Sequence, residues 1–208
     1  RHRNYRLFFF GQLTSLIGFW MQAIAQSWLV YRLTDSPLLL GLVSFASQIP
    51  MLLLTPFAGV VADRLPRRRI LLFTQVAMMS CATVFSILAL TGVIHVWHIV
   101  VIAALSGIAN SFDVPTRQSF TVEMVGRADL PKAIALNSIM FNAARLIGPA
   151  IAGLLVAAVG EGWCVALNAV SYVEVLVSLS MMDVTPQPPR EPSHPLSDLR
   201  AGFVYVTT

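Results

Sequence analysis

Six long apolar stretches constrain this chain more than any other feature of its sequence. Each is close to the ~20 residues that an α-helix needs to cross the hydrocarbon core of a bilayer. The stretches are Leu7–Tyr31, Leu38–Ala62, Ile70–Ile94, Val96–Ser119, Ala133–Val159 and Trp163–Met182. The sequence therefore predicts an all-α integral membrane protein with six spanning helices.

The composition agrees with a membrane protein and argues against other classes. Charged residues make up 12% of the chain, against about 25% in soluble domains. The basic residues lie in the loops between apolar stretches, so we expect them to orient helices and not to bind nucleic acid. Cys81 and Cys164 have no His or Cys at ligand spacing, so neither a metal site nor a disulfide is predicted. No cofactor is expected.

The basic residues are distributed unevenly between the two sides of the membrane. With the N-terminus placed inside, 12 of the 14 Lys and Arg residues lie inside, only Arg32 lies outside, and Arg145 falls within a helix. The inside residues are Arg1, Arg3, Arg6, Arg64, Arg67, Arg68, Arg69, Arg117, Arg127, Lys132, Arg190 and Arg200. The positive-inside rule therefore predicts a multi-pass protein of the inner (plasma) membrane whose N-terminus is cytoplasmic.

A charged hairpin separates the second and third apolar stretches. It begins with Gly59, has an acidic residue at Asp63, and continues with Arg64, Arg67, Arg68 and Arg69 around Pro66. Asp63 can accept hydrogen bonds from backbone N–H groups at the start of the next helix or from the Arg cluster. Gly59 would allow a close contact between helices.

This hairpin resembles the loop between helices 2 and 3 of the major facilitator superfamily, whose pattern is Gly-x-x-x-Asp-Arg/Lys-x-Gly-Arg-Arg-Lys/Arg. Pro66 stands where the pattern has Gly, so the turn has a φ near −65° in place of a positive one. The resemblance implies a latch that closes the cytoplasmic side in one state of a transporter. The alternative is that these Arg residues only anchor the helices.

The resemblance extends over essentially the whole chain. It implies that residues 1–182 are the N-terminal six-helix half of a twelve-helix fold with 3+3 inverted repeats. Residues 183–208 contain five Pro residues between Asp183 and Pro195 and are expected to be a cytoplasmic linker to a C-terminal half that this chain lacks. The repeat is faintly visible as Pro56 and Gly59 in one unit against Pro149 and Gly153 in the other.

Three of the predicted helices carry polar residues at helical spacing. In lipid such faces turn inward, onto other helices or a water-filled path. The residues are Gln12, Ser15, Gln22 and Gln26, then Ser106, Asn110, Asp113 and Arg117, then Ser138, Asn142 and Arg145. The second helix has fewer polar residues and the third very few. We therefore expect helices 1, 2, 4 and 5 to line a central path and helix 3 to lie outside it.

Charged residues within the apolar stretches are the sharpest candidates for a substrate or proton pathway. Such a charge costs ~2.5 to 3.5 kcal/mol at the centre of a spanning helix, so each calls for a partner or a function. Asp113 and Arg117 can pair with each other or reach the hairpin. Arg145 can bind or gate substrate, or form a fixed ion pair. Glu174 is predicted to be the deeper acid and the better proton carrier, unless it faces helix 3 or an interface.

The segment from Arg145 to Gly153 resembles the Gly-Pro motif in helix 5 of exporters and antiporters of the superfamily. Gly148 and Gly153 would let another helix approach closely, and Pro149 can bend the helix. This segment, with Asp113 to Gln118, is similar to the branch that holds bacterial siderophore (enterobactin-type) and macrolide exporters. A simple packing motif would look much the same.

These features favour a secondary active transporter, specifically a proton-driven exporter of a small molecule of the drug or siderophore type. The loops are short, and no nucleophile with a base, phosphate loop or metal cluster is present, so an enzyme is not predicted. An uptake transporter and a membrane scaffold without a transport cycle remain the alternatives. Because the four buried charges sum to zero, the charge of the substrate is not indicated.

Overall fold

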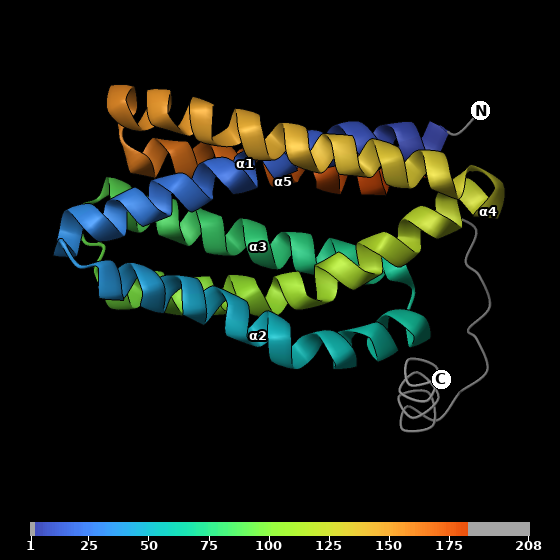
Figure 1. Cartoon of the computed structure of the whole chain (residues 1–208), viewed down its shortest axis with the longest axis horizontal. Coiled ribbons are helices and arrows are strands. Elements are labelled where there is room, and N and C mark those ends of the chain that lie inside the picture. Colours follow the sequence, from blue (N-terminus) through green and yellow to red (C-terminus); the bar gives the residue numbers. More distant parts are fainter. Residues whose placement is uncertain (1–2, 183–208) are drawn as a thin grey trace.

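Long helices make up nearly all of the chain that the structure describes. A computed structural model describes residues 3–182, and Figure 1 shows their helices running roughly side by side. The helices are α1 (Arg3–Thr34), α2 (Pro37–Arg64), α3 (Arg67–Leu90), α4 (Val96–Val159) and α5 (Glu161–Ser180). The linker predicted for residues 183–208 lies outside the described residues.

The longest helix, α4, contains two membrane spans. Gly126 interrupts it with φ 72° and ψ 174°, a conformation that Gly adopts readily because it has no Cβ. We call Val96–Gly126 the first limb of α4 and Ala128–Val159 the second limb. With α1, α2, α3 and α5 these limbs give six helices long and apolar enough to cross a membrane. The prediction of an all-α protein with six spanning helices is therefore confirmed.

The helices extend beyond several of the predicted boundaries. The loop expected between Ser119 and Ala133 is almost entirely helical and turns only around Gly126. The apolar pattern does not reveal the helical turns between Ser119 and Ala133, because the part of a helix that projects out of the hydrocarbon layer carries polar residues. In the other direction, α3 ends at Leu90 and not at Ile94, since Gly92 takes a φ of 73°.

The pattern of helix contacts has the symmetry that a 3+3 repeat requires. The first limb packs against α2 and α3, and α1 packs against the second limb and α5. In addition, α3 and α5 contact each other. In a 3+3 repeat, α1 corresponds to the first limb, α2 to the second limb and α3 to α5. When each span is replaced by its counterpart, the same pairs of neighbours result, as expected for two inverted units.

The bundle has two distinct ends. The α2–α3 turn, the Gly126 turn and the N-terminal end of α1 lie together at one end, on the right in Figure 1. We call it the basic end. The α1–α2 connection lies at the opposite end, with the α3–α4 and α4–α5 connections. This places the predicted inside Arg residues of the α2–α3 turn and Arg32 at opposite ends of the bundle.

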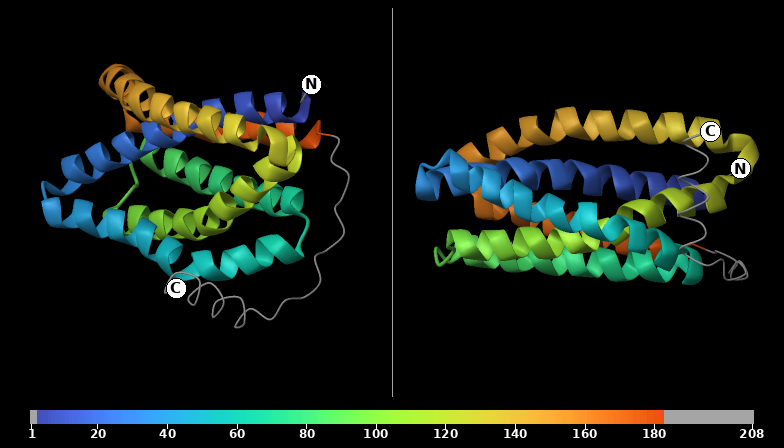
Figure 2. Two further views of the ribbon diagram at one scale, coloured as in Figure 1. Left: turned by 45° about the vertical axis from the view of Figure 1, so that its right-hand side comes forward. Right: turned by 60° about the horizontal axis from the view of Figure 1, so that its bottom comes forward.

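Two spans are much less buried than the others. In the most apolar window of α2, 11% of the residues are buried inside the structure, and in that of the second limb 22%, against 50% in α5. Figure 2 shows the second limb at an edge of the bundle in both views. Large apolar side chains such as Leu52 and Leu146 are more than 70% exposed there. Such faces need lipid or further protein to cover them.

Candidate functional site

A two-residue turn separates α2 from α3 at the basic end. Leu65 and Pro66 have extended backbone angles, and the φ of Pro66 is −57°. The Pro66 carbonyl oxygen accepts hydrogen bonds from the N–H groups of Arg69 and Ile70 as α3 begins. The turn is therefore made without a positive φ, as the Pro requires.

Arg67 joins three helices through its guanidinium. It lies 3.1 Å from the carboxylate of Glu123 on the first limb and 3.7 Å from that of Asp63 on α2. The side chain of Glu123 is 12% exposed, whereas that of Asp63 is 57% exposed. The pair with Glu123 is shorter and better shielded from water, so we expect it to be the stronger. Asp63 was expected to bind either backbone N–H groups at the start of the next helix or the Arg cluster. In the structure it contacts the Arg cluster, through Arg67.

Arg68 ties the same turn to the end of α5. Its Nε and Nη2 atoms donate hydrogen bonds to the carbonyl oxygens of Leu179 and Ser180, at 2.7 and 2.9 Å. These carbonyls belong to the last turn of α5, where intrahelical donors run out and a cation interacts favourably with the helix dipole. The two Arg residues therefore connect α2, α3, α5 and the first limb of α4 at one place.

The other residues of the hairpin contribute less to this network. Arg64 and Arg69 are exposed. A Cβ added to Gly59 would meet no atom within 4 Å. The close helix contact expected at Gly59 therefore does not form within the described residues.

Glu123 is a site residue that the sequence reasoning missed. The predicted fourth helix stopped at Ser119, which left Glu123 in a loop. In the structure the helix continues to Gly126, and the buried residues Asp113, Thr116 and Phe120 lead to Glu123 at helical spacings of three and four. Extending the polar face by one turn would have placed Glu123 below Asp113, facing the hairpin.

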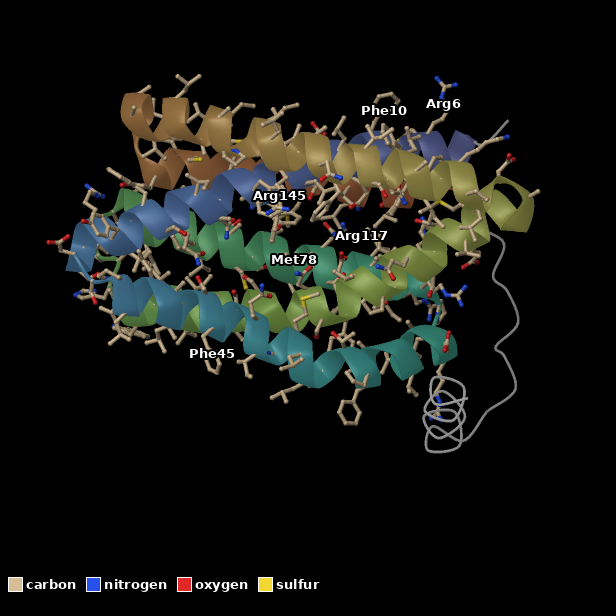
Figure 3. All side chains as sticks on the ribbon, viewed as in Figure 1. Arg6, Phe10, Phe45, Met78, Arg117 and Arg145 are labelled. Atoms are coloured by element: carbon tan, nitrogen blue, oxygen red, sulfur yellow. The ribbon has the colours of Figure 1, made fainter. Side chains whose placement is uncertain are left out.

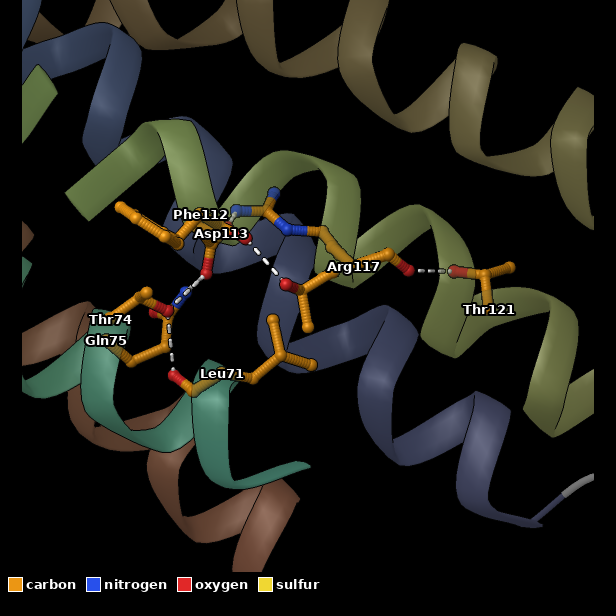
Figure 4. A network of polar contacts seen from close by, with 8 residues as sticks. Leu71, Thr74, Gln75, Phe112, Asp113, Arg117 and Thr121 are labelled. Atoms are coloured by element: carbon orange, nitrogen blue, oxygen red, sulfur yellow. Dashed lines mark hydrogen bonds and ion pairs between the residues drawn. The ribbon is translucent and has the colours of Figure 1, made fainter. Parts of the chain in front are cut away.

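A fully buried carboxylate forms the centre of a second polar cluster. Asp113, on the first limb, has a side chain that is 0% exposed. Its Oδ1 atom accepts hydrogen bonds from Thr74 Oγ1 at 2.9 Å and Gln75 Nε2 at 2.8 Å, and its Oδ2 atom pairs with Arg117 one turn along. Figure 4 shows these contacts. Asp113 and Arg117 were expected either to pair with each other or to reach the hairpin. In the structure they pair with each other.

Two members of this cluster come from the third helix, which was expected to carry very few polar residues. They are Thr74 and Gln75 of α3, and whether α3 lies outside a central path stays a prediction. Both are buried and bind Asp113. Two adjacent polar residues do not form a helical stripe, so a search by periodicity passes over them. The Nε atom of Arg117 and the Oε1 atom of Gln75 are buried and find no hydrogen-bond partner among residues 3–182.

The remaining residues of the predicted polar stripes have different surroundings. Gln22 accepts a hydrogen bond of 2.6 Å from Asn168, a fully buried residue of α5. Gln26 and Asn110 are half-buried. Asn142 is exposed on the second limb and donates to the backbone of Ser138 at 2.8 Å. Their roles in a substrate or proton path stay predictions.

Glu174 does not lie in the interior of the described bundle. It is exposed, on the face of α5 that carries the exposed residues Val170, Val173 and Val177. The buried face of α5 instead contains Asn168, Ser171, Tyr172 and Val175. Residues 3–182 therefore do not bury Glu174, whereas they bury Asp113 fully. The role of Glu174 as a proton carrier stays a prediction.

Arg145 is exposed on the second limb, with Trp20 of α1 beside it. Its guanidinium carbon lies 5.6 Å from the centroid of the Trp20 ring, a distance typical of a cation–π interaction. Figure 3 shows Arg145 and Arg117 between the layer of α1 and the second limb and the layer of α2 and the first limb. No ion pair or hydrogen bond joins Arg145 to another described residue.

One glycine brings Trp20 and Arg145 together. A Cβ added to Gly148 would lie 2.6 Å from the Cβ of Trp20 and 3.0 Å from the Ile17 carbonyl oxygen, so only Gly allows this close approach of α1 and the second limb. Gly153, predicted to pack in the same way, has no atom within 4 Å of such a Cβ. Pro149 lies inside the helix, which continues through it.

The opposite end has an ion pair of its own, which the sequence reasoning also missed. Arg32, near the end of α1, lies 3.0 Å and 3.1 Å from the two carboxylate oxygens of Glu161 in the first turn of α5. Two parallel contacts of this kind make a geometrically specific pair. It fixes α1 to α5 at the end remote from the hairpin.

The chain also matches a known family along its whole length. The sequence profile of the family described as "Transmembrane secretion effector" matches residues 1–208. The chain belongs to this family of major facilitator superfamily transporters. The resemblance in the hairpin and in the Gly-Pro segment is thereby confirmed at the level of the family.

Several proteins named as transporters, exporters or efflux pumps are similar in sequence. The staphyloferrin A transporter of Staphylococcus aureus is 29% identical over 182 residues, which cover 85% of this chain and 45% of that protein. The enterobactin exporter of Shigella boydii is 28% identical over 208 residues, which cover 99% of this chain and 49% of that protein. The multidrug efflux pump Tap of Mycolicibacterium fortuitum is 30% identical over 159 residues, which cover 74% of this chain and 39% of that protein. The chain thus spans about half the length of the curated relatives it matches.

Proposed function

We propose that this chain is the N-terminal half of a proton-driven secondary transporter that exports a small molecule by alternating access. Residues 1–182 form one six-helix half in this proposal, and residues 183–208 lead to a second half. The observation that carries the proposal is the contact of Arg67 with Asp63 and Glu123, which joins three helices at the basic end. Two of the similar proteins are named an exporter and an efflux pump, which favours export over uptake.

The basic end lies in the cytoplasm in this proposal, and the protein lies in the inner (plasma) membrane with its N-terminus inside. The asymmetry of Lys and Arg supports this orientation. The Arg67 and Arg68 contacts then act as a latch that holds the cytoplasmic ends of α2, α3, α5 and the first limb in one arrangement. A second arrangement becomes accessible when the second half withdraws and these contacts rearrange.

Asp113 is the proposed proton carrier. It is fully buried within a spanning helix, and its carboxylate is held by Thr74, Gln75 and Arg117. Protonation would remove the charge that holds Arg117, so the two residues would separate more easily. A proton at Asp113 is therefore coupled to the packing of the first limb against α3, which is the kind of two-state contact that alternating access needs.

Accumulation in cells tests the direction and the energy source together. Cells that express the full-length protein would be loaded with ethidium, a macrolide and a catechol siderophore in separate experiments, with and without a protonophore. Export predicts lower accumulation of at least one compound, and the protonophore should abolish the difference. Higher accumulation would indicate uptake, and no change for any compound would favour the scaffold alternative.

A further inference from the structure

We propose that Arg145 and Trp20 form a subsite that binds the anionic group of a flat aromatic substrate. This inference deepens the proposed function and rests on it, because it assigns the class of molecule that the transporter takes. Its starting point is the charge of Arg145, which has no ion pair or hydrogen bond among residues 3–182.

The position of Arg145 makes an unpaired charge costly. It lies about 17 residues from the start of the second limb and about 14 from its end, or roughly 20 to 25 Å from each at 1.5 Å per residue. That is near the centre of the span, where ionisable side chains are expensive and usually functional. No Asp or Glu among residues 3–182 forms an ion pair with this guanidinium. An anion that comes from elsewhere would therefore be bound favourably.

The acids of the spanning region are already accounted for. Asp113 is paired with Arg117 and held by two further donors. Glu174 is exposed on α5. The Asp113 carboxylate is paired with Arg117 one turn away, so it is not available to pair with Arg145. Among residues 3–182, Asp113 and Arg117 therefore form a balanced pair, whereas Arg145 and Glu174 each lack an ion pair.

The neighbours of Arg145 indicate what kind of anion fits. The guanidinium lies over the ring of Trp20. The rings of Phe19 and Phe141 are each edge-on to the Trp20 ring, with 5.8 Å between the ring centroids. Phe19 and Phe141 are 40% and 45% exposed, so their surfaces remain open to a ligand. Asn142 is exposed one turn away and can add an amide donor to the site.

This combination suits an aromatic ring that carries a carboxylate or a comparable delocalised anion. The guanidinium is a flat fork of N–H donors that matches the two oxygens of a carboxylate. The aromatic side chains offer faces and edges against which a flat ring can pack. A neutral aromatic compound would keep the ring contacts and lose the charge contact, so the charge should dominate selectivity.

A matched pair of probes tests the inference on the purified full-length protein. The probes are 2-naphthoate and its uncharged amide, 2-naphthamide, which have the same rings, and equilibrium dialysis would give both dissociation constants. We expect the wild type to bind the anion at least about tenfold more tightly than the amide. In Arg145→Gln this preference should disappear with little change for the amide, and Arg145→Lys should keep part of it.

A second pair of variants tests the aromatic part. Trp20→Leu should weaken binding of 2-naphthoate several-fold, whereas Trp28→Leu, an exposed residue of the same helix, should not. Thermal unfolding of each variant checks that it is folded, and the comparison of the two probes on the wild type needs no variant at all.

Three results would overturn the inference. They are equal binding of the two probes, no binding of 2-naphthoate by the wild type, and an anion preference that survives in Arg145→Gln. The first would indicate that a carboxylate from the rest of the protein neutralises Arg145. None of these results would affect export of ethidium or its loss with a protonophore, so failure of this inference is distinguishable from failure of the proposed function.

Discussion

Arg67 shows how one side chain can connect several helices at a membrane surface. Its two acidic partners differ in distance and in exposure, so their contributions should differ as well. An ion pair exposed to water stabilises by about 1 kcal/mol or less, whereas a charged hydrogen bond that is shielded from water contributes about 1.5 to 3 kcal/mol. Glu123 belongs to the second class and Asp63 to the first.

We therefore expect Glu123→Gln to lower the thermal stability of the purified full-length protein and to slow transport. Asp63→Asn should slow transport with little loss of stability, because its side chain is 57% exposed and its contact with Arg67 is 3.7 Å long. Thermal unfolding, and efflux of the compound that the accumulation assay shows to be exported, check this order when measured on both variants. A larger loss of stability in Asp63→Asn than in Glu123→Gln would contradict it.

At the scale of the elements, the second limb of α4 depends on Gly148 for its contact with α1. The space available for a side chain there is smaller than a methyl group, since an added Cβ would lie 2.6 Å from Trp20 and 3.0 Å from a backbone oxygen. The backbone atoms cannot move without moving the helix. Overpacking of this kind typically costs 1 to 3 kcal/mol.

Gly148→Ala should therefore destabilise the protein by about 1 to 3 kcal/mol and change the fluorescence of Trp20. The matched control is Gly153→Ala, where a Cβ meets no atom within 4 Å. It should leave the unfolding temperature unchanged or raise it slightly, because Ala favours helix. Equal effects of the two substitutions would show that α1 and the second limb are not in close contact at Gly148.

The same elements show what the sequence could and could not predict. The six spans follow from the length of the apolar stretches, and the Asp113–Arg117 pair follows from a spacing of four residues on one helix. Glu123 was missed because the helix runs past the apolar stretch. The burial expected for Glu174 came from its charge alone, whereas Asn168 and Ser171 mark the face of α5 that is buried in the described residues. The contacts of Thr74 and Gln75 depend on how α3 packs, which no local pattern encodes.

In the described half as a whole, ion pairs lie at both ends of the bundle and one further pair lies between them. The contacts of Arg67 and Arg68 lie at the basic end, the pair of Arg32 and Glu161 lies at the opposite end, and Asp113 with Arg117 is buried between the helices. Contacts at both ends join α1, α2, α3, α5 and the first limb, and the second limb packs closely on α1 at Gly148. Such a bundle could rock as a rigid body against a second half, with a titratable carboxylate in its interior.

Proton movement in proteoliposomes distinguishes a proton-coupled exporter from an uncoupled transporter. The full-length protein would be reconstituted with a pH-sensitive dye inside the vesicles, and the compound that the accumulation assay shows to be exported would be added outside. We predict that flux of this compound drives protons in the opposite direction in the wild type and in Glu174→Gln, and that Asp113→Asn abolishes this proton movement. Undiminished proton movement in Asp113→Asn, or flux of the compound without protons in the wild type, would show that Asp113 is not the proton carrier or that transport is not coupled to protons.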